Sequence, residues 1–248
     1  MTGDTWSHER YTALVAAEID AMARTIRDRD PLTPVPSCPG WTLADLIRHT
    51  GSVHRWAARL LVELRQRGLR REDAALPADP GEYPDWLIAG GEELTRALRS
   101  ADPDTPMWSL TADRRLAFWS RRQLHETVVH HADAVLALGG EPSIDPGTAL
   151  DGVDEFFAIL TAAARYAPRV RELTGDGETL AFRSGDQAWL VRLAPDGFTW
   201  SRERGPATVT VTAESPGDLL LLLWGRPSRV EVEGDVKLLP WWTERSAI

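Results

Sequence analysis

Residues 121–133 place a carboxylate and an imidazole four positions apart inside an apolar pattern of helical period. Positions i and i+4 are neighbours on a helix, so Glu126 and His130 are predicted to share one face with Arg122 and Asp133. Leucine, valine and alanine residues occupy another face of the same helix. Such a helix can offer two metal ligands but cannot complete a site, so the fold would have to supply a third ligand from elsewhere. The same spacing is also typical of an ordinary surface pair of glutamate and histidine.

The best candidate for a third ligand is His49, about two turns into another predicted helix. Thr42 has the spacing of an N-cap whose capping-box partner is Asp45, and Trp41 and Leu46 are placed as a hydrophobic staple. This pattern predicts a well-defined helix start. It also accounts for Asp45 without any catalytic role.

The other histidines considered and the single cysteine are predicted to have packing roles. His54 lies about 140° around the helix from His49, so the two histidines cannot serve one site. His125 and His131 are interpreted as bundle or surface residues. Cys38 is interpreted as a packed turn residue, because no basic neighbour in the sequence would favour its thiolate.

The first 145 residues are predicted to form a four-helix bundle. Apolar residues recur at three- or four-residue steps in four stretches, which are residues 6–29, 42–67, 85–100 and 117–138. Proline- and glycine-containing segments separate these stretches. In a bundle, metal sites are built from inward side chains of facing helices.

Residues 146–248 are predicted to form a separate, smaller α+β domain with an antiparallel sheet. Helices are expected at residues 150–166, 219–224 and 235–243. Short strand-like runs, some of them joined by Gly-Asp and Asp-Gly turns, occupy residues 179–182, 188–193, 198–200, 207–212 and 230–232. The predicted fold class of the whole chain is therefore α+β.

Composition excludes several classes of partner. The formal net charge of −9, with no basic block, argues against binding to nucleic acid or to anionic membranes. No apolar run approaches the length of a membrane span, and the polar first residues do not resemble a signal peptide. One cysteine allows no internal disulfide. We therefore expect a cytoplasmic protein with small-molecule partners, either a monomer or a homodimer.

Two pairs of motifs resemble the mycothiol-dependent maleylpyruvate isomerase family. In the first part, residues 38–49 (CPGWTLADLIRH) and 125–130 (HETVVH), followed by Asp133, resemble its DinB-like metal-binding bundle. In the second part, residues 219–226 (LLLLLWGR) and 230–235 (VEVEGD) resemble its sterol-carrier-like C-terminal domain. The resemblance covers nearly the whole chain.

The resemblance implies specific roles for four residues. A divalent metal, usually zinc, would be held by His49, Glu126 and His130, and Arg226 would contact the substrate. Two imidazoles and one carboxylate are the ligands of a catalytic zinc with an open position. Bound there, the thiol of mycothiol would become a nucleophilic thiolate.

Three functions remain open at this stage. The first is a metal- and thiol-dependent isomerase or S-transferase. The second is a binding or stress-type protein that has a metal site but no catalysis. The third is a metal-dependent hydrolase that needs no thiol.

Overall fold

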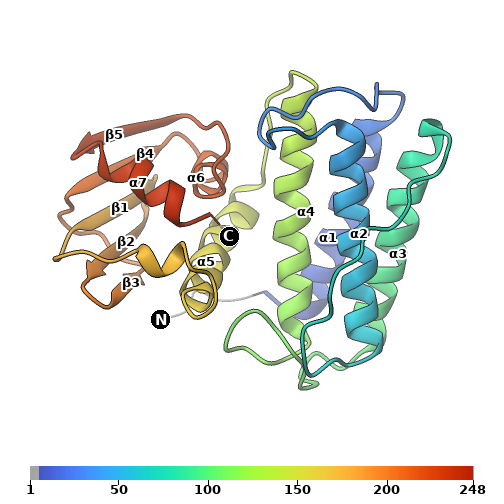
Figure 1. Cartoon of the computed structure of the whole chain (residues 1–248), viewed down its shortest axis with the longest axis horizontal. Helices are drawn as coiled ribbons and strands as arrows, with labels where there is room; N and C mark the ends of the chain where they lie inside the picture. The colour runs from blue at the N-terminus through green and yellow to red at the C-terminus, as the bar shows by residue number, and fades with distance from the viewer. Residues whose placement is uncertain (1–5, 248) are drawn as a thin grey trace. The chain divides into compact units, whose positions relative to one another are not determined.

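The computed structural model describes residues 6–247, which divide into two compact units (Figure 1). One unit extends to Ser143 and the other begins at Ile144. No helix among residues 6–247 is long and apolar enough to cross a membrane. The α+β fold class is confirmed, since a helical unit precedes a unit built on a sheet. The boundary between independent domains at residues 145 and 146 stays a prediction.

The first unit is a bundle of the four predicted helices. They are α1 (His8–Ile26), α2 (Leu43–Val62), α3 (Tyr83–Ser100), which follows the 3-10 turn η1 (Pro80–Glu82), and α4 (Ala117–Ala137). Both α1 and α2 contact α3 and α4, so the four helices form a closed ring around one core (Figure 1). Fully buried side chains from all four helices fill that core, including Val15, Met22, Leu46, Leu60, Leu87, Leu94 and Val129. Burial of such apolar surface is the main stabilising contribution to the bundle.

The predicted start of α2 is confirmed. The Thr42 side chain accepts a hydrogen bond from the Asp45 amide, and the Asp45 carboxylate accepts one from the Thr42 amide at 2.9 Å. This reciprocal pair satisfies two amides that would otherwise lack partners in the first turn. The capping box therefore fixes where α2 begins and, with it, where His49 lies along the helix.

A cluster of tryptophans fastens two long connections to the bundle. The rings of Trp56, Trp108 and Trp119 have centroids 5.4 to 6.3 Å apart. The Trp56 indole donates to the Leu69 carbonyl, and the Trp119 indole donates to the Trp108 carbonyl, both at 2.9 Å. Buried indole N–H groups need such partners. The segments that follow α2 and precede α4 are therefore held against the helices at these points.

The second unit is a five-stranded sheet with three helices. The elements are α5 (Pro146–Ala163), the 3-10 turn η2 (Val170–Glu172), β1 (Thr179–Ser184), β2 (Gln187–Ala194), β3 (Gly197–Ser201), β4 (Val209–Ala213), α6 (Pro216–Leu223), β5 (Val230–Gly234) and α7 (Leu238–Arg245). Their strand order is β3-β2-β1-β4-β5. Every strand-like run of the sequence thus became a strand of one sheet.

The prediction of a wholly antiparallel sheet is wrong. The β1–β2, β2–β3 and β4–β5 pairs are antiparallel, but β1 and β4 run parallel, with Phe182 opposite Val211. The chain forms the β1–β2–β3 meander and then returns to place β4 beside β1. Such a return needs a crossing connection and not a hairpin, so turn residues in the sequence do not signal it.

Aromatic side chains form the core of the second unit. Phe182 of β1 contacts Phe157 of α5 and Trp242 of α7, at centroid distances of 5.8 and 6.0 Å. Trp189 of β2 lies opposite Phe182 in the register and is fully buried. The two helices therefore pack on the same face of the sheet as these aromatic residues.

Candidate metal centre

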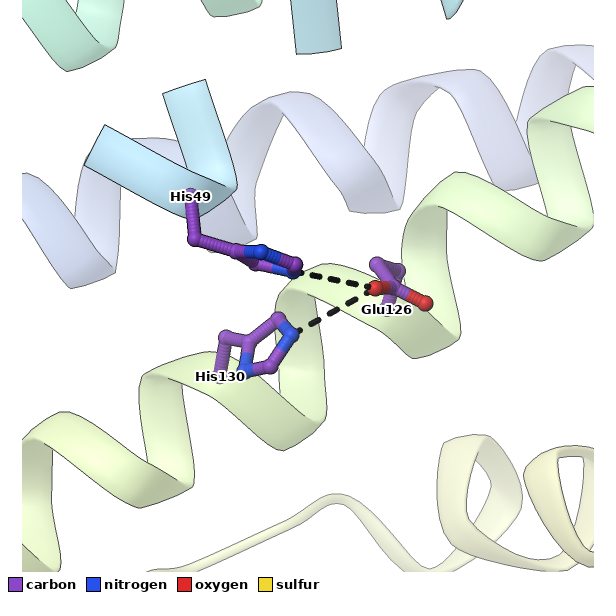
Figure 2. Close-up of side chains that lie close together, drawn as sticks. All are labelled: His49, Glu126 and His130. Carbon is purple, nitrogen blue, oxygen red and sulfur yellow. Dashed lines mark ion pairs between the residues drawn. The ribbon is translucent and has the colours of Figure 1, made fainter. Parts of the chain in front are cut away.

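The structure brings together the three residues proposed as metal ligands. His49 comes from α2, and Glu126 and His130 come from α4 (Figure 2). One nitrogen or oxygen donor from each residue lies within 4.8 Å of the others. The Oε1 atom of Glu126 is 3.7 Å from His49 Nε2 and 3.4 Å from His130 Nε2 (Figure 2). The donors thus converge on one point between two facing helices, as the helix-face prediction required.

The two oxygens of Glu126 have different partners. Arg122, one turn earlier on α4 and almost wholly buried, donates to Oε2 in an ion pair. The other oxygen, Oε1, faces both imidazoles. Arg122 was predicted to share the helix face of Glu126 and His130. Its burial and its contact fit the orienting position, because a buried guanidinium restricts the rotation of the carboxylate that it pairs with.

The imidazole of His130 is fixed from its far side. His130 Nδ1 is 3.0 Å from Oδ2 of Asp133, a carboxylate with no solvent exposure. A carboxylate accepts, so Nδ1 carries the hydrogen and Nε2 presents its lone pair toward Glu126 and His49. The predicted placement of Asp133 on the helix face of His130 is confirmed, since the two side chains are in contact.

A tight turn before α2 brings two further side chains to the centre. The Trp41 amide donates to the Cys38 carbonyl at 3.0 Å, and Gly40 between them has φ of +83°, which suits the third position of a type II turn. The Cys38 thiol donates to Asp133 Oδ2 at 3.5 Å, and the Trp41 ring lies 4.9 Å from the His49 ring. The sequence analysis interpreted both residues as packing residues and missed these contacts.

Burial keeps the His49 imidazole neutral. The pKa of His49 is lowered to about 3, mainly because burial disfavours the charged form, and the charges of His130 and Arg71 add to this effect. The carboxylates of Asp73 and Asp133 act in the opposite direction. A neutral imidazole has an unprotonated ring nitrogen at neutral pH, which is the form that binds metals.

The remaining histidines considered in the sequence are not among the three converging donors. His54 is fully buried, its Nε2 is 3.0 Å from the Thr127 hydroxyl, and burial lowers its pKa to about 3. His131 lies 2.6 Å from the Glu18 carboxylate of α1, and His125 is buried on α4. The choice of His49 over His54 agrees with this grouping.

Arg226 belongs to the second unit. It follows α6 directly, where Gly225 has φ of +73° and ends the helix. Its guanidinium donates to the Trp224 carbonyl at 2.6 Å and lies 5.9 Å from the Trp224 ring. The side chain is half-buried. Its role in substrate binding stays a prediction.

Two family models match the chain. The model described as the mycothiol maleylpyruvate isomerase N-terminal domain matches residues 12–135, and the MDMPI C-terminal domain matches residues 148–240. The chain belongs to the mycothiol maleylpyruvate isomerase family. Both matches lie within one unit each, and the first contains all three donors of the candidate centre.

Solved structures of this family share the fold. A crystal structure of the mycothiol-dependent maleylpyruvate isomerase aligns with a TM-score of 0.56 and 20% identity, over 93% of this chain and 95% of that chain. A variant of that isomerase, with one histidine replaced by alanine, aligns with a TM-score of 0.55, the same identity and the same coverage. No curated protein sequence matches the chain significantly.

Proposed function

We propose that this chain is a metal- and thiol-dependent enzyme, an isomerase or S-transferase that uses mycothiol with a divalent metal, for which we propose zinc. Family membership supports the use of a thiol, since the related crystal structures are of a mycothiol-dependent isomerase. The observation that carries the proposal is the convergence of His49, Glu126 and His130 on one point.

The spacing of the donors fits a small divalent metal. Two ligand atoms at the usual zinc distance and a tetrahedral angle lie about 3.4 Å apart. The Glu126 oxygen is 3.4 and 3.7 Å from the two imidazole nitrogens, close to that value. Two imidazoles and one carboxylate are also a ligand set that leaves a position for a non-protein ligand. Nickel, cobalt, manganese and iron accept the same donors, so the donor set alone does not select zinc.

Each protein residue near the centre has a defined task in this proposal. A divalent metal bound here would lower the pKa of a bound thiol and so supply a thiolate near neutral pH. Arg122 keeps one Glu126 oxygen turned toward the histidines. Asp133 keeps the lone pair of His130 Nε2 directed at the same point. The chain thereby preorganises the donors before any ligand binds.

The isomerisation itself requires no net gain or loss of atoms. The thiolate sulfur forms a bond to one carbon of a cis double bond while the π electron pair moves onto the conjugated carbonyl as an enolate. The resulting single bond rotates, and return of the enolate pair restores the double bond as trans while the same C–S bond breaks. In an S-transfer reaction the sulfur would stay attached to the electrophile. Arg226 is the proposed partner of a substrate carboxylate, for which a guanidinium gives two parallel hydrogen bonds.

The test is the metal content of the purified protein and of the Glu126→Ala variant prepared alongside. We expect about one metal per chain in the parent and almost none in the variant, because two imidazoles alone bind far more weakly than three donors. Glu18→Ala is a matched control, since Glu18 contacts His131 and lies apart from the three donors. It should retain the metal.

Turnover measurements then separate the three functions. Activity that depends on both metal and thiol supports the proposal. Metal-dependent turnover without any thiol would indicate the hydrolase, and a loaded protein that shows no thermal shift with mycothiol would indicate the binding protein. A parent that contains no metal and fails to take up zinc would contradict the proposal altogether.

A further inference from the structure

The connection between α2 and α3 runs back along α2 (Figure 1). Two hydrogen bonds fix its path. The Leu69 carbonyl accepts from the Trp56 indole at 2.9 Å, and five residues later the Ala74 amide donates to the buried Ser52 hydroxyl at 2.8 Å. From Leu69 to Ala74 the connection therefore runs antiparallel to α2, because its contacts move from Trp56 back to Ser52, about one helical turn. Residues 70–73 lie between these anchors, alongside residues 52–56 of α2, which begin about one turn after His49.

This short stretch carries one pair of opposite charges. Arg71 Nε is 3.7 Å from Asp73 Oδ1, and the two side chains are 39% and 53% exposed. An exposed pair at this distance contributes little to stability, so its guanidinium can exchange partners at low cost. Ala74, which follows Asp73 directly, is held by Ser52, three residues after His49 on α2, so the pair lies about one helical turn along α2 from that imidazole.

We propose that Arg71 binds a carboxylate of an anionic substrate held beside the metal, and that Asp73 occupies the guanidinium when no substrate is present. The inference rests on the proposed function, because it assigns a further substrate-binding residue to that centre. A guanidinium is well suited to this task, since it stays charged and can form paired hydrogen bonds to a carboxylate. Arg71 belongs to the same unit as the three donors.

The test uses protein loaded with cobalt, whose visible spectrum reports the bound ion and its thiol ligand. Two thiols serve as probes: mercaptosuccinate, which carries carboxylates beside its thiol, and mercaptoethanol, which is uncharged. Affinities are measured by titration for the parent and for three variants, Arg71→Ala, Asp73→Asn and Arg70→Ala. Arg70 is the matched control, because it is exposed and carries the same charge one residue earlier.

We expect Arg71→Ala to weaken mercaptosuccinate binding about tenfold while mercaptoethanol binding stays within about twofold. Asp73→Asn should have the opposite sign and strengthen mercaptosuccinate binding, since it releases the guanidinium. Arg70→Ala should change neither probe by more than about twofold. A general loss of fold would weaken both probes together and could not produce changes of opposite sign.

Equal effects of Arg71→Ala and Arg70→Ala on mercaptosuccinate would overturn the inference and leave the metal centre intact. A parent that develops no cobalt spectrum would instead refute the metal centre, and the assignment of Arg71 would fall with it. The two failures are therefore distinguishable in a single set of titrations.

Discussion

Asp133 is a carboxylate with no solvent exposure that accepts hydrogen bonds from His130 and from Cys38. Its contact with the ring fixes which nitrogen of His130 has the lone pair. Partners of this kind are typically worth tenfold to a hundredfold in metal affinity. We therefore expect Asp133, which is not itself a proposed ligand, to control how well His130 binds a metal.

We predict that Asp133→Asn lowers zinc affinity at least about tenfold, because the neutral amide no longer stabilises the Nδ1–H tautomer of His130 by charge. Competition with a chelator measures the affinity, and circular dichroism checks that the helices persist. Cys38→Ser, which keeps a donor to Asp133, should stay within about twofold of the parent. Unchanged affinity in Asp133→Asn would show that the contact does not orient the ring.

A second residue-scale prediction concerns the stability of the metal-free protein against pH. Burial holds the pKa of His49 and of His54 at about 3 in the folded state, against 6.5 for an ordinary histidine. Between these values the unfolded chain binds protons that the folded chain does not, so stability falls as pH decreases through this window. Each histidine contributes up to about 1.4 kcal/mol per pH unit.

The variant His54→Gln isolates one of these contributions, since His54 is not among the proposed ligands. Denaturant midpoints of parent and variant, measured from pH 7 to pH 4.5 without metal, should converge as the pH falls. Curves that stay parallel throughout would contradict the assigned titration of His54.

The sequence predicted those site residues that are neighbours on one helix. Glu126, His130, Arg122 and Asp133 are related by steps of three or four residues on one helix, and these steps fix their proximity once the helix forms. The contacts of Cys38 with Asp133 and of Trp41 with His49 depend on the path of a turn across two elements. No local spacing encodes such contacts, and the sequence analysis missed them.

At the level of helices and strands, the capped start of α2 fixes the position of the proposed ligand His49 as well as that of the helix. The capping box of Thr42 and Asp45 sets the first turn, and His49 follows on the same rigid helix. The Trp41 ring, immediately before the cap, packs against His49. Fraying of this turn would therefore loosen one donor of the centre while the two donors on α4 stayed in place.

We predict that Thr42→Ala destabilises the protein by about 1 kcal/mol, the usual cost of removing a helix cap. Thr42→Ser keeps the hydroxyl and should behave like the parent. Thermal unfolding measures the stability, and zinc titration should show a parallel loss of affinity in the alanine variant alone. If both variants unfold at the parent temperature, the cap does not hold the start of α2.

Helices were easier to predict than strand partners. The four bundle helices were placed within a few residues of their ends, because apolar periodicity and caps are properties of neighbouring residues. The strands were found too, and the hairpins with them. The parallel β1–β4 pair was not, since it joins segments almost thirty residues apart whose pairing is decided by packing of the whole unit.

At the scale of the whole molecule, all three proposed ligands belong to the unit that ends at Ser143. A ligand that binds only the folded state stabilises what it binds, by about 2.7 kcal/mol at a hundredfold excess over its Kd. Metal is therefore expected to protect the bundle directly.

We predict that zinc slows amide hydrogen exchange in α2 and α4 and leaves β1 and β2 unchanged. Exchange measured by mass spectrometry on the full chain, with and without zinc, tests this. Glu126→Ala should show no zinc-dependent protection anywhere. An equal increase in the strands would mean that the two units open together.

The sequence changes near residue 145 from four helical stretches to a mixture of helices and strand-like runs. The two family models match on either side of this point. Composition and periodicity could not predict the path of the connection after α2. That path is set by single hydrogen bonds to Trp56 and Ser52.

The confinement of the three donors to one unit also has an evolutionary consequence. Mutations, insertions or even replacement of the chain after Ser143 would leave the donor set untouched. If the proposed metal site is used, selection could retain it in the first unit while the sequence of the second unit changes.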